Sequence, residues 1–272
     1  MNRNLIFLPF LALALPSASA QAFMRPIENA AQMALGGAAV ALPTSIGGLS
    51  NPAQLGGLNG RQLLAWSALP HGLVSVRSQG MQALYPLTTL TGLGLGLVHT
   101  GMEGYSEQRF QASYGRKLSE QWAVGGSFLV PRVAAQADGS LTRFRVGLGI
   151  LLQPIPGLRF GAVLEDPFPP KDILTLQSMR LGAHWVLSNL LEWTLEVSKS
   201  LRTPAQTRFG LVYQAHPKWA FRLGARNQPL RLAFGLGLEL FKGLRCDFAS
   251  EWHPVLGWTP ALMLVWSRPS SS

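Results

Sequence analysis

The chain has 272 residues, of which 47% are hydrophobic and 13% are charged, with a formal net charge of +10 and a single cysteine, Cys246. One cysteine excludes an internal disulfide, and beyond the N-terminus no apolar run reaches the roughly 20 residues that a membrane-spanning helix needs. A chain that is apolar overall, with a mean hydropathy of +0.19, but nowhere continuously so is typical of strands that are apolar on alternate residues.

Residues 1–20 have the pattern of a secretory signal peptide. Arg3 supplies the positive charge, residues 5–15 form an apolar run, and Ala18-Ser19-Ala20 match the small-residue cleavage pattern. The apolar run is too short to cross a bilayer as a helix. We therefore expect cleavage before Gln21 and export of the mature chain, with an uncleaved anchor as the alternative.

Residues 21–60 are expected to form a small segment, here called the hatch, ahead of the first strand. Its centre, residues 35–53, carries no charge and holds the glycine pairs Gly36-Gly37 and Gly47-Gly48. Glycine pairs allow close backbone approach, and Asn51-Pro52 favours a turn. An uncharged segment of small residues packs in a confined interior without burying an unpaired charge, as a plug requires.

Residues 61–268 alternate between apolar side chains and polar or small ones, most cleanly from about residue 106. In the longest example, from Leu230 to Leu240, every second residue is leucine or phenylalanine. We count about fourteen strands of roughly 8 to 11 residues, the length that a tilted membrane strand needs. A soluble β-sandwich would show the same alternation with the leucine face buried. Residues 269–272 form a short tail.

The lengths of the connections favour a membrane barrel over a sandwich. Such barrels have short periplasmic turns and longer outer loops. Short inner turns are expected at 87–91, 117–120, 153–157, 188–190, 214–218 and 241–243. Longer outer connections are expected at 71–77, 131–140, 166–177 and 250–260, with short outer turns at 102–106 and 226–229.

The eight tryptophans give a second reason, because all fall near the ends of predicted strands. Tryptophan prefers the headgroup level, since its ring is apolar and its N–H needs a partner. The residues expected at the membrane interface are Trp122, Trp185, Trp193, Trp219 and Trp266 on the inner side and Trp66, Trp252 and Trp258 on the outer side. The sequence thus predicts an all-β, transmembrane antiparallel β-barrel of about fourteen strands in a bacterial outer membrane.

The hatch also carries a family resemblance. Leu35-Gly36-Gly37-Ala38, together with Asn51-Pro52-Ala53 just before the first strand, resembles the N-terminal hatch of FadL-like outer-membrane barrels, and by pattern the PorV/PorQ type. The resemblance implies that the hatch folds into or under a barrel over nearly the whole mature chain. An acidic pair often precedes the Asn-Pro-Ala motif in the family, whereas this chain has Thr44-Ser45-Ile46 there, so no role of those carboxylates transfers.

Charged residues on the face opposite the apolar one are expected to line the barrel lumen. They are Arg109, Arg143, Arg145, Arg159, Arg180, Arg208, Arg222, Arg231 and Arg245, with the acids Glu165, Glu192, Glu196, Glu239 and Asp247. Charges in a confined interior pair or reach water, which favours an ion-pair ladder that stiffens the wall and holds the hatch. The excess of arginine leaves a second interpretation open, a passage that selects anions or binds head groups.

Glycines recur on the same lumenal face. Examples are Gly92, Gly94 and Gly96 in one strand and Gly235 and Gly237 in another. Glycine within a strand marks either the close approach of another backbone, here the hatch, or a bend or bulge. Both interpretations fit the sequence.

Neither catalysis nor a metal or cofactor is expected. The chain lacks GxSxG, HExxH and GxxxxGK motifs. His253 lies near Ser250 and Glu251, but this arrangement is not diagnostic of a hydrolase. The positive charge does not indicate nucleic acid, because the chain is exported and its arginines lie on one interior face. Outer-membrane lipid is the expected partner.

Two functions follow from this fold. The first is a non-enzymatic, PorV/PorQ-like barrel that acts in protein secretion or surface export as a docking or shuttle barrel, bound to secretion-system components or exported proteins. The alternative is a FadL-like passive transporter of small hydrophobic or amphipathic compounds. The outer connections, although longer than the inner turns, leave little chain outside the barrel to build a large basin for ligand capture, which favours the first function. The apolar outer loop at 166–177 suits a ligand or a partner.

Overall fold

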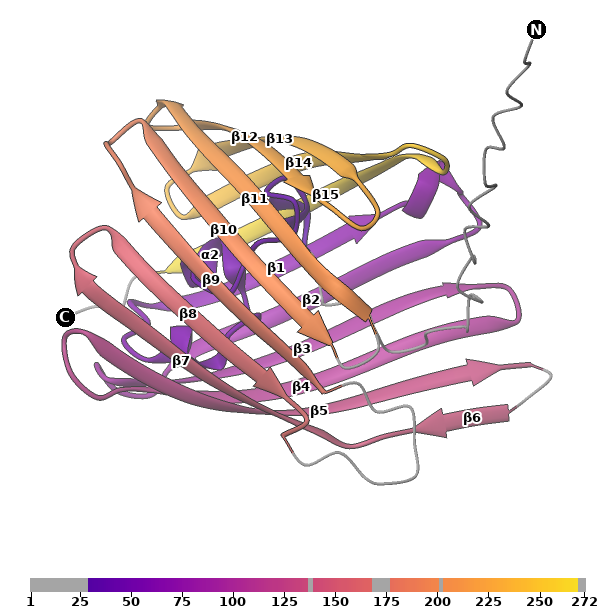
Figure 1. Ribbon diagram of the computed structural model, residues 1–272, viewed down its shortest axis with the longest axis horizontal. Helices are drawn as coiled ribbons and strands as arrows, with labels where there is room; N and C mark the ends of the chain where they lie inside the picture. Colours follow the sequence, from indigo (N-terminus) through magenta and orange to yellow (C-terminus); the bar gives the residue numbers. More distant parts are fainter. Residues whose placement is uncertain (1–28, 137–138, 168–176, 201–202, 269–272) are drawn as a thin grey trace, which may run out of the picture.

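The computed structural model describes residues 29–136, 139–167, 177–200 and 203–268, which fold into a closed antiparallel barrel around a short helical segment (Figure 1). Its strands are β1 (Arg61–Ala68), β2 (Arg77–Pro86), β3 (Thr91–Met102), β4 (Tyr105–Lys117), β5 (Trp122–Ala135), β6 (Gly139–Thr142), β7 (Arg145–Ile155), β8 (Leu158–Glu165), β9 (Ser178–Val186), β10 (Leu191–Ser200), β11 (Thr203–His216), β12 (Trp219–Arg226), β13 (Arg231–Phe241), β14 (Leu244–His253) and β15 (Gly257–Arg268).

The barrel closes through two pairings. β1 pairs with both β2 and β15, and β5 pairs with both β4 and β7. Among the described residues, β1–β5 and β7–β15 therefore form a ring of fourteen strands, while β6 pairs only with β5. The predicted all-β barrel of about fourteen strands is confirmed.

The alternation of side chains decides which face of the wall points outward. In β13, Leu232 and Phe234 are 47% and 50% exposed, whereas Ala233 between them is 6% exposed. The same contrast recurs around the ring, so large apolar side chains cover the outer surface. A sandwich would have buried that leucine face, and the sandwich alternative is wrong.

The two ends of the barrel differ in their connections. At one end, here called the turn end, residues 87–90, 118–121, 156–157, 187–190, 217–218 and 242–243 join neighbouring strands. The other end, here called the loop end, carries longer segments at 69–76 and around β6. The long loop predicted at 250–260 is wrong, because Trp252 pairs with Trp258 and extends the β14–β15 ladder to a three-residue turn at 254–256. Most of the loop predicted at 166–177 lies outside the described residues, as do residues 1–28 and 269–272.

The described part of the hatch, residues 29–60, lies inside the barrel (Figure 1). It contains α1 (Ala30–Met33), α2 (Thr44–Gly47) and the 3-10 turn η1 (Pro52–Leu55), and a further 3-10 turn, η2 (Pro70–Gly72), follows β1. No helix in the described ranges is both long and apolar enough to cross a bilayer. Because the hatch is a run of short turns, its side chains project in all directions and meet the wall around most of the ring.

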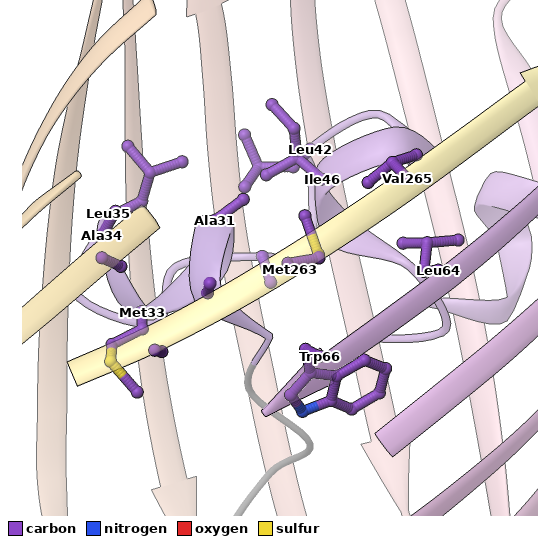
Figure 2. Packing of buried hydrophobic residues seen from close by; sticks show 14 of the residues in the cluster. Ala31, Met33, Ala34, Leu35, Leu42, Ile46, Leu64, Trp66, Met263 and Val265 are labelled. Atoms are coloured by element: carbon purple, nitrogen blue, oxygen red, sulfur yellow. The ribbon is translucent and has the colours of Figure 1, made fainter. Parts of the chain in front are cut away.

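The apolar core lies between the hatch and the wall. Figure 2 shows Leu64 from β1 and Met263 and Val265 from β15 among the hatch side chains. Trp66 belongs to this cluster and is only 5% exposed, so its predicted place at the membrane interface is wrong. Its indole fills the space beside Gly80, where no side chain stands. Packing in the interior therefore decided that the Trp66 indole points into the barrel and not toward the membrane.

The other seven tryptophans lie at the two rims, where the structure leaves them half-buried or exposed. At the turn end, the rings of Trp185 and Trp193 meet edge to face with centroids 6.1 Å apart. The remaining five are Trp122, Trp219 and Trp266 near the turn end and Trp252 and Trp258 near the loop end.

Candidate functional site

The hatch is first of all tied to itself. Asn29 caps α1, because its side chain accepts a hydrogen bond from the Gln32 backbone N–H (2.9 Å). In turn, the Gln32 side chain accepts one from the Asn29 backbone N–H (3.3 Å). The two side chains also donate to α2, through the carbonyls of Ile46 (2.9 Å) and Gly47 (2.6 Å). The two short helices, which would not be stable alone, therefore form one unit.

Inward-facing glycines of the wall make room for this unit. Gly92, Gly115, Gly125 and Gly149 pair across four successive strands of the barrel. A Cβ at Gly125 would stand 2.4 Å from the carbonyl carbon of Pro52. The same close approach occurs at Gly161, Gly210, Gly224 and Gly235, which face Val40, Leu35, Gly36 and Ala34 respectively.

These contacts decide between the two interpretations of the lumenal glycines. Gly92 and Gly94 face Leu55 and Leu49 of the hatch, and the register shifts of the ladder fall elsewhere. Gly237 is the exception, since it makes room for the Asp247 carboxylate and the Arg222 guanidinium. Close approach of the hatch, rather than bulging, explains Gly92, Gly94 and Gly235.

Glu196 of β10 is the central polar contact between wall and hatch. It is 1% exposed, and its Oε2 accepts hydrogen bonds from the backbone N–H groups of Ala39 (2.8 Å) and Val40 (3.0 Å). Its Oε1 lies 3.1 Å from Nη1 of Arg208 and 4.0 Å from Nη1 of Arg180. One buried carboxylate thus satisfies two hatch donors and is flanked by two cations.

Three arginines complete this grip by donating to hatch carbonyls. Arg180 donates to Ser50 (2.6 Å), Arg208 to Gly37 (3.1 Å) and Arg245 to Ser45 (2.6 Å). On the opposite side of the lumen, the Gln82 side chain accepts from the Leu49 N–H (3.1 Å) and the Gln111 side chain donates to the Leu49 carbonyl (3.0 Å). The hatch backbone is held from both sides.

The remaining charges form ion pairs within the wall. Asp247 is fully buried and binds Arg222 (2.6 Å) and Arg245 (2.8 Å). Glu251 binds Arg231 (2.7 Å) and also Arg226. A third group joins Arg145 with Glu165 and Asp166, and Glu165 with Arg180. These pairs have the arrangement of the predicted ion-pair ladder.

Five further charged residues were predicted in the lumen. Arg109 is half-buried in β4, near the Arg145 group, and its charge interacts with Glu165. Arg159 donates to Gln153 (3.2 Å), and Glu192 lies 3.5 Å from His184. Two predictions are corrected: Arg143 lies between β6 and β7 rather than in a wall strand, and Glu239 is exposed at the turn end.

Several buried polar residues were missed from the sequence. Gln82, Gln111, His184, Arg226 and Glu251 are buried or in the ladder. All stand at inward positions of their strands, so the strand alternation predicts that their side chains face the lumen. Attention to charge alone overlooked the amides, and Glu251 appeared only as part of a loop that the structure shows to be strand.

Asn51 joins the hatch to itself and to the wall. It is fully buried, and its Nδ2 donates to the carbonyls of Val40 (3.0 Å) and of Ile150 in β7 (3.1 Å). Its Oδ1 accepts from the Ala53 N–H (3.0 Å) and so begins η1. The motif Asn51-Pro52-Ala53 is therefore a corner of the hatch that docks on β7.

We expect Asn51→Ala to leave barrel assembly intact and to loosen this corner. The change removes both donated bonds and leaves the buried Ala53 N–H without its acceptor, at about 1–3 kcal/mol, while the Val40 carbonyl keeps the bond from Gln54. Heat-modifiable gel mobility would remain normal, while amide exchange in residues 40–55 and permeability would rise. A misassembled barrel would instead show that the hatch is purely structural.

No metal or hydrolase site forms in the described ranges. No three His, Cys, Asp or Glu side chains converge there as metal ligands would. The rings of His71 and His253 meet at 6.0 Å, but Glu251 is bound by two arginines and is not available to orient them.

Comparisons with known proteins agree on the fold alone. No protein-family model matches the chain, and no curated protein matches it by sequence. Among solved structures, the toluene transporter TbuX of Ralstonia pickettii is 13% identical, with a TM-score of 0.65 over 92% of this chain and 98% of the other. The monoaromatic hydrocarbon channel CymD is 13% identical, with a TM-score of 0.66 over 90% and 98%. A FadL homologue of Pseudomonas aeruginosa is 11% identical, with a TM-score of 0.61 over 90% and 98%. The chain thus has the architecture of the FadL-like outer-membrane β-barrels.

Proposed function

We propose that this protein is a non-enzymatic outer-membrane channel that admits small hydrophobic compounds past its hatch. One observation carries the proposal: the segment packed inside the barrel is the chain's own N-terminal hatch, held by hydrogen bonds and apolar contacts between short turns. Such contacts separate and re-form, so a hatch held in this way can move aside.

The outer surface supports a membrane location. Apolar side chains cover the wall and tryptophans stand at both rims, as a bilayer requires. Short turns at one end and longer connections at the other match the periplasmic and outer sides of such a barrel. The predicted signal peptide, which lies outside the described residues, would deliver the chain to that membrane.

The interior supports apolar cargo over anions. Arg180 and Arg208 share Glu196 and donate to hatch carbonyls, and Arg222 binds Asp247, so each of these cations already has bound partners in the wall or the hatch. The hatch also presents buried leucines, such as Leu35, Leu42 and Leu55, to the wall. Two proteins of the same fold are by name a toluene transporter and a monoaromatic hydrocarbon channel, and we extend that class of small hydrophobic cargo to this chain.

The docking or shuttle role implied by the PorV/PorQ resemblance stays a prediction. It needs a surface that fits a protein partner, and the site described above lies inside the barrel. Transport past the hatch uses that site directly and is therefore preferred.

A disulfide between hatch and wall tests whether the hatch moves. A Cβ at Gly182 of β9 would lie 3.5 Å from Cβ of Val40, within the usual range of a disulfide. In a Cys246→Ser background, we expect the oxidised pair Val40→Cys and Gly182→Cys to reduce uptake of labelled toluene to that of cells without the protein. Reduction of the disulfide would restore it.

The two single-cysteine variants are the matched controls, and oxidant is expected to leave their uptake unchanged. The extent of cross-linking is read from intact mass. A fully cross-linked barrel that takes up toluene as fast as the reduced one would disprove the moving hatch.

A further inference from the structure

A groove of about 650 Å³ lies across β2, β3, β4, β5 and β7 on the outer wall. Its floor forms where three outward positions are small, namely Ala83, Ala112 and Gly126. Tyr85 and Tyr114 border it toward the turn end. Leu95 of β3 stands between Ala83 and Ala112, with which it pairs. Leu93, Phe128 and Val146 are the other large side chains of the lining, and all four are more than 40% exposed.

The groove has the dimensions of a lipid chain. Four strand spacings of about 4.8 Å separate β2 from β7, so the groove extends over about 19 Å. One leaflet contributes about 15 Å of hydrocarbon. A single acyl chain lying obliquely on the wall fits this length.

A pair of arginines stands beside the turn end of the groove. Arg61 of β1 lies directly opposite Arg268 of β15 on the same outward face, and both are exposed. Like charges in such a pair repel each other. Within the described ranges, no acidic side chain forms a salt bridge with either.

Arg61 is connected to the groove through Tyr85. Its guanidinium carbon lies 4.7 Å from the centre of the Tyr85 ring, and its Nη2 donates to the Tyr85 hydroxyl (3.1 Å). This fixes one cation of the pair at the border of the apolar groove. The arrangement places two positive charges at one end of an apolar slot.

We propose that the groove binds one acyl chain of an anionic glycerophospholipid whose phosphate is held by Arg61 and Arg268. An anion between the two guanidinium groups offsets their repulsion, and its oxygens accept hydrogen bonds from their N–H groups. The assignment rests on the proposed membrane location, because the turn end then lies at the inner leaflet. A second copy of the chain is a poorer occupant, since a symmetric dimer in the membrane brings an identical arginine pair to the same depth.

Native mass spectrometry of the mature protein, released from nanodiscs with equal phosphatidylglycerol and phosphatidylcholine, tests this. We expect retained phosphatidylglycerol to exceed phosphatidylcholine, with each arginine contributing about fivefold. Arg268→Gln is expected to reduce that preference about fivefold, and Ala112→Phe, which fills the floor, to remove the retained lipid.

Two matched controls separate the site from the surface at large. Arg132→Gln removes an exposed arginine from β5 near the loop end, and Ala65→Phe enlarges an exposed alanine of β1 outside the groove. Neither is expected to change retained lipid. Heat-modifiable gel mobility verifies that every variant assembles.

Three outcomes would overturn the proposal. They are equal retention of both lipids, retained lipid unchanged in Ala112→Phe, and a wild-type dimer that Ala112→Phe separates. The test is independent of transport, because it reads bound lipid without cargo. If the wild-type protein did not take up toluene but kept its lipid preference, the proposed channel function alone would be disproved. Failure of the protein to enter the nanodisc would count against both the channel function and the lipid site.

Discussion

Replacement of Glu196 by alanine is expected to release the hatch from β10 and to lower the free energy of unfolding by about 3–5 kcal/mol. The change leaves Arg180 and Arg208 buried without this carboxylate and removes the acceptor of two backbone donors, at Ala39 and Val40. Urea unfolding in detergent measures the loss, and amide exchange in residues 34–42 reports the release.

Glu120→Ala is the matched control. Glu120 also binds a cation, Lys117 at 2.8 Å, but its side chain is 91% exposed in a turn, where an ion pair contributes little. We expect stability and hatch exchange to remain those of the wild type. If Glu196→Ala behaved like Glu120→Ala, the hatch would be held by apolar packing, and the polar contacts would matter little.

The second large effect is expected from Leu236→Arg in the middle of β13. Leu236 pairs with Phe221 and Phe248 on the outward face, so the arginine would meet the centre of the bilayer. A charge at that depth costs about 2–4 kcal/mol in a membrane barrel. We expect most of the protein to remain unassembled, measured as the fraction with heat-modifiable mobility after insertion into vesicles.

Leu232→Arg places the same charge on the same face of the same strand, nearer the loop end. There the cost falls to about 0–1 kcal/mol, and assembly should be close to normal. Equal assembly of the two variants would contradict the depth and orientation assigned to β13.

The wall was largely predictable because its signal is local. Alternation with a period of two survives in each strand independently of its neighbours, and all six predicted inner turns overlap a connection at the turn end. Trp66 shows the limit. Leu63, Leu64 and Ala65 before it are all apolar, so the alternation leaves the direction of β1 ambiguous, and packing against Gly80 and the hatch decided it.

The sequence by itself determined the strands of the wall, their apolar outer face and the uncharged centre of the hatch, since each follows from the order of residues within short segments. Only the tertiary structure decided which interior charges meet. Glu196 and Ala39 are separated by 157 positions, and their contact depends on how the ring closes and how the hatch turns inside it. The outer groove has the same origin, because Ala83, Ala112 and Gly126 come onto one stretch of the wall only through the register of β2, β3, β4 and β5.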